Sequence, residues 1–458
     1  MESKNPAEEE ENVKFVPNND AALSKEKDQI IDAIGEIGPW QLRRICFLFL
    51  FKACLALPNM GITFFSARTD FWCQRPDSET LVPVEEWRNM SSPLILNSDG
   101  EWHRDQCHIW NSEDFKQPLD NGTKPCTSWE YDRSVYTNTI IHDFDLVCQN
   151  RNKKDWAQSS YFTGFLIGMA VSGSLSDYFG RMRTIVPLLM GMCTFGTLSA
   201  FSTTVEWFMV TRFLQGCCHS VGIVFCWTVE LVGGKWQTII GMSNWGPWVL
   251  GIFLTAAVSA VAPDWRHYQL ITSVPVYVTV IFYCILPESP RWLLSVGRIE
   301  EAEVIVKKAA KENDRPLPEN WKLHPISEGQ AKKGTVFDLF SSVNMATKTL
   351  ILFYAWFTNS FVYYGLTLSC GSLGGSLMIN YLLNGLMEIP AYSVCTWILL
   401  NAGRKKCYVS LMTAGGLSLF AIMGIPLNYF QYNWPAIVLS LIGKMCITGK
   451  VYRFHISF

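Results

Sequence analysis

The chain alternates between long apolar stretches and shorter polar ones. The apolar stretches are about 20 residues long, which is the length that crosses the hydrocarbon core of a bilayer as a helix. We predict membrane-spanning helices at residues 43–65, 157–176, 184–203, 207–230, 238–261, 267–286, 347–368, 374–400, 407–427 and 434–450. The predicted fold class is an all-α polytopic membrane protein.

Composition excludes a soluble fold. Only 17% of the residues are charged and 49% are hydrophobic, whereas about a quarter of the residues in an ordinary soluble protein are charged. Residues 1–29 are polar and lack the basic segment and apolar core of a signal peptide.

The spacing of the spans indicates four parts. Residues 1–42 form an N-terminal tail, and residues 43–286 form a six-helix half that carries a long loop at 66–155. A helical linker at 287–346 precedes an incomplete second half at 347–458. Two helical-bundle halves joined by a linker are typical of transporters with a central site between repeats.

Lys and Arg set the predicted orientation, because cytoplasmic loops are enriched in them. Arg181, Arg183, Lys235, the Lys-rich stretch at 307–348 and residues 404–406 all fall on one side. We therefore expect a cytoplasmic N-terminus, an extracellular loop at 66–155 and residence in the plasma membrane.

The long loop has the features of an extracellular segment. Asn89 and Asn121 begin N-glycosylation sequons. Four cysteines outside the cell are expected to form two disulfides, in one of three connectivities that the sequence leaves open. They are Cys73, Cys107, Cys126 and Cys148. No CxxC pair or His cluster suggests a metal site.

Two loops occupy the same place in the two halves. One runs from Gly173 to Arg183, and the other includes Gly403 and Arg404. Glycine permits a tight turn between helices, and Asp with Arg can form a charge lock that breaks when the halves rock. The alternative is that both are ordinary basic cytoplasmic loops.

The first loop resembles the signature of the major facilitator superfamily, G-x-x-x-D-x-x-G-R-x-R/K. The runs at 144–148, 212–216, 287–294 and 388–392 further resemble the organic cation, carnitine and organic anion transporter family. The resemblance implies a major facilitator fold and a set of gating residues. They are Gly173, Asp177, Gly180, Arg181, Arg183, Arg212, Glu230, Glu288, Arg291, Gly403 and Arg404.

The sequence departs from the family pattern in two places. Family members carry an Arg about seven residues after Glu230, where this chain has Gln237, so we expect a weaker charge lock. The segment at 443–448 resembles the tenth family helix, and we expect the last two helices to be missing. A truncated form that partners or regulates a full-length relative is therefore one alternative function.

Candidate substrate residues lie in the spans. Glu388 is an ionisable residue in the middle of a span, and we predict that it is the counter-ion of a substrate ammonium; a packing role is the alternative. Trp356 and Tyr363 share a helical face and could bind a cation through their rings, although lipid or packing contacts would give the same spacing. The resemblance adds Phe225 and Asn244.

We expect a carrier of small organic cations or carnitine-like zwitterions, working by alternating access. A lipid bilayer and the small substrate are the expected partners, with no nucleic acid, no cofactor and no enzymatic activity. Membrane potential or coupling to Na⁺ or H⁺ would drive transport. His219 is a candidate for proton coupling, and the alternative is a packing role. Transport of organic anions is a further alternative.

Overall fold

The computed structural model describes most of the chain as helices. The described residues are 28–67, 69–76, 81–96, 102–111, 122–219, 221–283, 286–318, 320–324, 339–368, 376–402, 404–425 and 434–448.

The first half contains the helices that precede the linker. They are α2 (Gln29–Ile34), α3 (Pro39–Met60), α4 (Ile62–Phe65), α7 (Arg151–Phe179), α8 (Arg181–Ala200), α9 (Val205–Cys217), α10 (Val221–Glu230), α11 (Gly234–Ser243), α12 (Gly246–Val261) and α13 (Trp265–Tyr283). The linker contributes α14 (Pro290–Ser295) and α15 (Ile299–Glu312). The second half consists of α16 (Val343–Leu368), α17 (Leu377–Leu386), α18 (Glu388–Ala402), α19 (Arg404–Ile422) and α20 (Trp434–Thr448).

Each predicted span lies on one helix or on two helices in series. By length and apolar composition, four described segments can cross a membrane: Pro39–Phe65, Val205–Glu230, Gly234–Val261 and Leu377–Leu399. Lys406–Ile422 and Trp434–Thr448 are apolar but shorter. The other four predicted spans lie on α7, α8, α13 and α16, which are at least 19 residues long but more polar.

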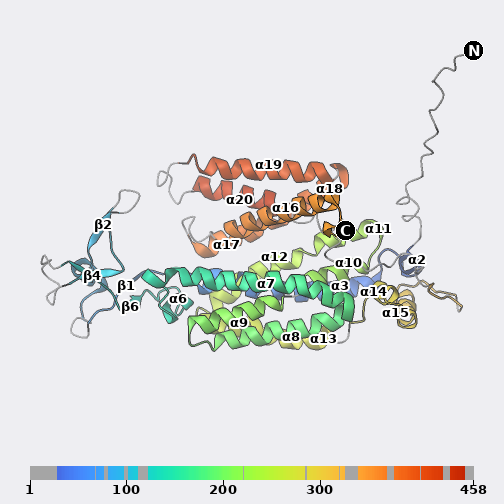
Figure 1. Ribbon diagram of the computed structural model, residues 1–458, viewed down its shortest axis with the longest axis horizontal. Coiled ribbons are helices and arrows are strands. Elements are labelled where there is room, and N and C mark those ends of the chain that lie inside the picture. The colour runs from blue at the N-terminus through green and yellow to red at the C-terminus, as the bar shows by residue number, and fades with distance from the viewer. Residues whose placement is uncertain are drawn as a thin grey trace, which may run out of the picture.

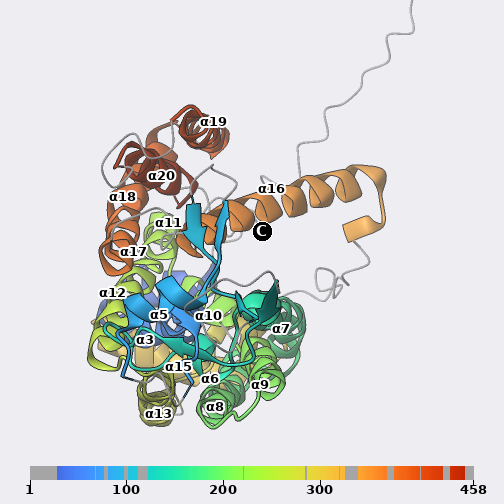
Figure 2. The same cartoon turned by 90° about the vertical axis from the view of Figure 1, so that its left-hand side faces the viewer.

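The two halves form separate groups of helices, with the second half above the first in Figure 1. A loop domain between α4 and α7 projects from one end of the bundle, and α2, α14 and α15 lie at the opposite end, here called the distal end. Figure 2 shows most helices end-on, whereas α16 runs obliquely across the view. This division into two groups agrees with the two helical-bundle halves that the sequence predicts.

Glycines allow α7 and α9 to pack with their backbones in contact. A Cβ added to Gly164 would lie 2.0 Å from the carbonyl oxygen of Phe213, and one added to Gly168 would lie 2.2 Å from that of Cys217. A Cβ added to Gly216 on α9 would lie 2.3 Å from the carbonyl oxygen of Tyr161. Small residues four apart are typical of close helix packing in membranes.

One apolar core joins the distal helices to the first half. Ile34 of α2, Trp292 of α14 and Val306 of α15 are buried together with Ile185 of α8 and Trp227 of α10. Because burial of apolar surface holds these elements together, α2 and the start of the linker are expected to move with the first half.

The loop domain contains three two-stranded antiparallel sheets, two short helices and a 3₁₀ turn. Strand β1 (Phe71–Cys73) pairs with β6 (Trp129–Tyr131), β2 (Leu94–Leu96) with β3 (Trp102–Arg104), and β4 (His108–Trp110) with β5 (Thr123–Pro125). The helices α5 (Val84–Ser91) and α6 (Ile140–Asp143) and the 3₁₀ turn η2 (Cys148–Asn150) complete the domain.

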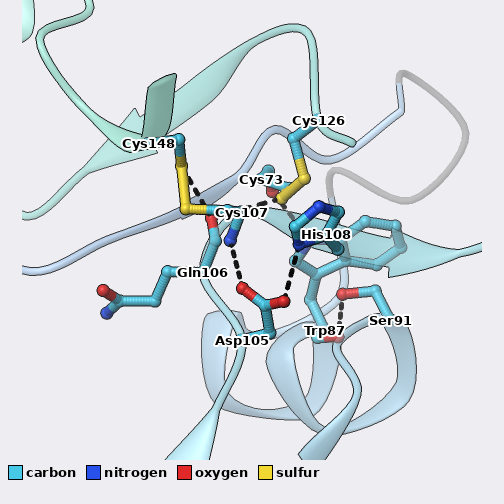
Figure 3. Close-up of a disulfide and its surroundings, with 9 residues drawn as sticks. All are labelled: Cys73, Trp87, Ser91, Asp105, Gln106, Cys107, His108, Cys126 and Cys148. Carbon is cyan, nitrogen blue, oxygen red and sulfur yellow. Dashed lines mark hydrogen bonds and ion pairs between the residues drawn. A yellow bond between two sulfur atoms is a disulfide. The ribbon is translucent and has the colours of Figure 1, made fainter. Parts of the chain in front are cut away.

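Two disulfides lie close together in the loop domain, as Figure 3 shows. Cys73 pairs with Cys126, and Cys107 pairs with Cys148. This is one of the three connectivities that the sequence left open. Asn89 of the first sequon is exposed on α5, while the hydroxyl of Ser91 is buried and donates to the carbonyl of Trp87. Asn121 lies outside the described residues.

Candidate functional site

A cavity of about 810 Å³ lies between the two halves. The first half contributes residues of α3, α7, α10 and α12 to its wall, and the second half contributes residues of α16, α18 and α20. Ten of the twenty described lining residues are aromatic: Phe165, Phe225, Trp245, Trp248, Phe353, Trp356, Phe357, Tyr363, Tyr364 and Tyr392. The volume and apolar lining are those of a small-molecule site.

A fully buried carboxylate lies behind this aromatic wall. Glu388 is the first residue of α18, directly after the break at Met387 that separates α17 from α18. Its Oε1 accepts a hydrogen bond from the hydroxyl of Tyr363 at 2.7 Å, and its Oε2 accepts one from Tyr392 at 2.5 Å. Both tyrosines line the cavity, so Glu388 influences the cavity through their hydroxyl groups.

Lys444 of α20 is the cationic partner of Glu388. Its Nζ lies 3.4 Å from Oε1 of Glu388, and both side chains are fully buried. The same ammonium donates to the hydroxyl of Thr367 and lies 3.2 Å from the centre of the Tyr363 ring. Glu388, Lys444, Tyr363 and Tyr392, here called the Glu388 cluster, thus connect α16, α18 and α20.

A second buried lysine faces the cavity from the first half. Lys52 of α3 is fully buried and lines the cavity. Its Nζ donates to Oδ1 of Asn244 at 2.7 Å and lies 4.6 Å from the centre of the Trp245 ring. Both partners are neutral, in contrast to the carboxylate beside Lys444.

Contacts between aromatic residues connect the two lysine sites. The Trp245 and Trp248 rings lie 6.3 Å apart, and the indole N–H of Trp248 donates to the hydroxyl of Tyr363 at 3.0 Å. The wall therefore runs without interruption from Lys52 in the first half to Glu388 in the second.

The structure brings three of the five predicted substrate residues to the cavity wall. Phe225, Trp356 and Tyr363 line it, whereas Glu388 lies behind Tyr363 and Asn244 lies behind Lys52. The sequence reasoning missed Lys52 and Lys444. The rule that singled out Glu388, an ionisable residue inside an apolar span, applies equally to both lysines and would have found them.

Charged residues of the predicted gating motif meet at the distal end of the first half. Arg181 pairs with Glu230 at 2.9 Å (Nη2 to Oε1) and with the carboxylate of Asp177. Glu288 accepts from the backbone N–H of Arg181 at 2.9 Å and so caps the start of α8. Gln237 donates to a backbone carbonyl of Val232, leaving Glu230 to Arg181. In the described residues these partners of Arg181 belong to the first half and the linker, so a lock across the two halves remains a prediction.

Other predicted gating residues lie apart from this group. Gly173 and Arg183 are exposed, and Arg291 pairs with Asp28 at 2.5 Å. Gly403 lies outside the described residues, and Arg404 is described only as the first residue of α19.

Arg212 and His219 lie inside the first half. Arg212 is fully buried, donates to the carbonyl of Pro58 at 2.9 Å and stacks on the Tyr161 ring at 4.3 Å. His219 lines the cavity; its Nδ1 is 3.1 Å from the Tyr161 hydroxyl, and its Nε2 is buried without a hydrogen bond among described atoms. Nε and Nη2 of Arg212 are also buried without a hydrogen bond among described atoms. His219 differs from Arg212 because it lies on the cavity wall.

Gly180→Ala is expected to destabilise the loop that joins α7 to α8. Gly180 has φ +108°, and an added Cβ would lie 2.5 Å from the Glu288 carboxylate. The backbone strain alone costs about 1–3 kcal/mol, and the clash adds to it. Thermal unfolding of the purified protein measures the effect.

Gly297→Ala is the matched control for this prediction, because Gly297 has φ +80° and open space around it. Gly180→Ala should lower the melting temperature more than Gly297→Ala does. Equal decreases in melting temperature would mean that the contact with Glu288 adds nothing to the backbone strain.

Comparisons with known proteins agree with this arrangement. The model of the family described as sugar (and other) transporter matches residues 128–449. An organic cation transporter protein of Drosophila melanogaster is 31% identical, over 93% of this chain and 80% of its own length. The organic cation/carnitine transporter 2 of Homo sapiens is 30% identical, over 94% of this chain and 80% of its own length.

Solved structures with the same fold include bacterial sugar symporters. The inward-open xylose transporter XylE from E. coli aligns with a TM-score of 0.53 at 13% identity, covering 90% of this chain and 80% of its own. The proton:xylose symporter XylE bound to 6-bromo-6-deoxy-D-glucose gives a TM-score of 0.53 at 15% identity, over 90% and 85% of the two chains. At these identities the likeness concerns the fold alone.

Proposed function

We propose a substrate class from the premise that this chain belongs to the organic cation, carnitine and organic anion transporters, within the sugar (and other) transporter family of the major facilitator superfamily. It is a multi-pass membrane protein of a transporter family and not an enzyme. The proposed substrates are small organic cations or carnitine-like zwitterions, carried across the plasma membrane by alternating access.

The aromatic cavity between the two halves is the observation that supports this proposal. Each aromatic ring face that contacts a cation in a partly dry site contributes about 0.5–2 kcal/mol. The hydroxyls of Tyr363 and Tyr392 donate to Glu388, which makes both rings more electron-rich. One face of the Tyr363 ring already holds the Lys444 ammonium, so its other face would meet a substrate. A quaternary ammonium, which has no N–H donors, suits such a wall.

The energy source follows from the substrate charge. For a monovalent cation, the membrane potential contributes about 2.3 kcal/mol per 100 mV. A zwitterion carries no net charge, so its accumulation requires coupling to Na⁺ or H⁺. His219 is the candidate proton carrier, because it is a titratable group on the cavity wall.

Uptake of labelled tetraethylammonium and of a labelled trimethylammonium carboxylate by cells that express the chain tests the proposal. Trp356→Leu removes a cavity aromatic and is expected to raise KM about 2- to 30-fold, which corresponds to one cation–π contact. Trp397→Leu is the matched control, because Trp397 is 68% exposed on α18 and does not line the cavity.

Saturable uptake that responds to Trp356→Leu and not to Trp397→Leu is the expected result. Absence of uptake at normal surface delivery would contradict the proposal and support the alternative of a partner or regulator of a relative.

A further inference from the structure

Lys52 carries an ammonium group on the wall of an apolar cavity. Its side chain is fully buried on α3. A lysine inside a membrane-spanning helix is costly and is retained where it has a partner or a functional ligand. The two buried lysines of the described chain differ in this respect, because Lys444 has the carboxylate of Glu388 beside it.

The described contacts of the Lys52 ammonium are one hydrogen bond to Asn244 and the face of the Trp245 ring. An ammonium has three donors, so two remain for a ligand. No carboxylate in the described part of the chain forms an ion pair with Lys52, and no acidic side chain lines the cavity. Among the described residues, no acidic group balances the Lys52 ammonium.

Asn244 supplies a second, independent sign of a ligand at this place. Its Oδ1 accepts from Lys52, which leaves Nδ2 as the donor end of the amide. That nitrogen is buried and donates to no described atom, and the buried Nε2 of His219 on the same cavity is also without a hydrogen bond. A buried donor without an acceptor is costly, and an anionic group that reaches Lys52 would provide an acceptor for the Asn244 amide beside it.

We propose that Lys52, with Asn244 behind it, forms a carboxylate-binding subsite of the cavity. The wall that begins at Lys52 continues through Trp245 and Trp248 to Tyr363, so a substrate with an ammonium at one end and a carboxylate at the other contacts both parts. This inference rests on the proposed transport function and narrows it. The preferred substrates are zwitterions, and plain cations of the same size bind less well.

A matched pair of ligands tests the subsite on the unmutated chain. γ-Trimethylaminobutyrate is the zwitterion, and its methyl ester is a cation of similar size that lacks the carboxylate charge. The purified full chain in lipid nanodiscs should bind the zwitterion at least tenfold more tightly than the ester. Equal affinity for the two would overturn the inference and leave the proposed function intact.

Lys52→Met and Lys52→Arg identify the residue responsible. Lys52→Met keeps a long apolar stem and removes the charge, so it should lower zwitterion affinity at least tenfold and leave ester affinity unchanged. Lys52→Arg keeps the charge and should retain the preference for the zwitterion. A loss of both affinities by the same factor in Lys52→Met would mean a packing role and would contradict the subsite.

Asn244→Leu provides a second variant if Lys52→Met does not reach the membrane; it too should weaken the zwitterion selectively. A third ligand, in which a tert-butyl group replaces the trimethylammonium, tests the carboxylate subsite separately from the proposed cation site. If that anion binds as well as the zwitterion, the subsite stands and the proposed cation site fails. If none of the three ligands binds, both fail.

Discussion

Glu388→Gln is expected to reduce uptake at least tenfold, and to reduce the amount of protein at the cell surface as well. The carboxylate is fully buried and holds Tyr363, Tyr392 and Lys444 around it. Breaking a buried ion pair by removing one partner costs about 3–5 kcal/mol, because it leaves the other charge uncompensated. Uptake assays and surface biotinylation measure the two effects separately.

The double variant Glu388→Gln/Lys444→Met removes both charges and is the control. It should restore surface delivery, since replacing both partners of a buried pair is often neutral. It should not restore uptake, because the introduced glutamine amide would offer one acceptor oxygen to two tyrosine hydroxyls and would no longer hold both of them as the carboxylate does. Recovery of both quantities would show that the pair is only structural.

Gly164→Leu is expected to abolish folding of the first half. The added side chain would begin 2.0 Å from the carbonyl oxygen of Phe213 on α9. Neither backbone can move away without opening the α7 and α9 contact, where Gly168 and Gly216 are equally close to the opposite helix. We expect a loss of about 3 kcal/mol or more, at the upper end of overpacking effects. Surface delivery and thermal unfolding are the readouts.

Gly173→Ala on the same helix is the control, since a Cβ there meets nothing within 4 Å. It should fold like the unmutated chain. Normal surface delivery of Gly164→Leu would contradict the close packing of α7 and α9.

The sequence predicted the elements well because their determinants are local. An apolar stretch of about 20 residues predicts a membrane-spanning helix without knowledge of its neighbours. The seven-residue spacing of Trp356 and Tyr363 likewise predicted one helical face, and both residues line the cavity. The loop from Gly173 to Arg183 indicated the superfamily, and the family comparisons confirmed that identification.

What the sequence did not reveal depends on contacts between distant segments. The pattern of α20 alone does not show that Lys444 meets Glu388 of α18, and the pattern of α3 does not show that Lys52 meets Asn244. For the same reason Glu388 was predicted as a direct substrate counter-ion, whereas the structure places Lys444 beside it. The packing of the helices alone determines which residue lies beside each buried charge.

Photo-cross-linking with a diazirine-bearing trimethylammonium probe tests most directly the claim that substrate occupies the cavity between the halves. Adducts on the purified chain would be mapped by mass spectrometry, with and without excess unlabelled γ-trimethylaminobutyrate. The account predicts competed adducts on α12 and α16, which carry Trp248, Trp356 and Tyr363. Adducts confined to the loop domain, or adducts that the competitor does not reduce, would contradict it.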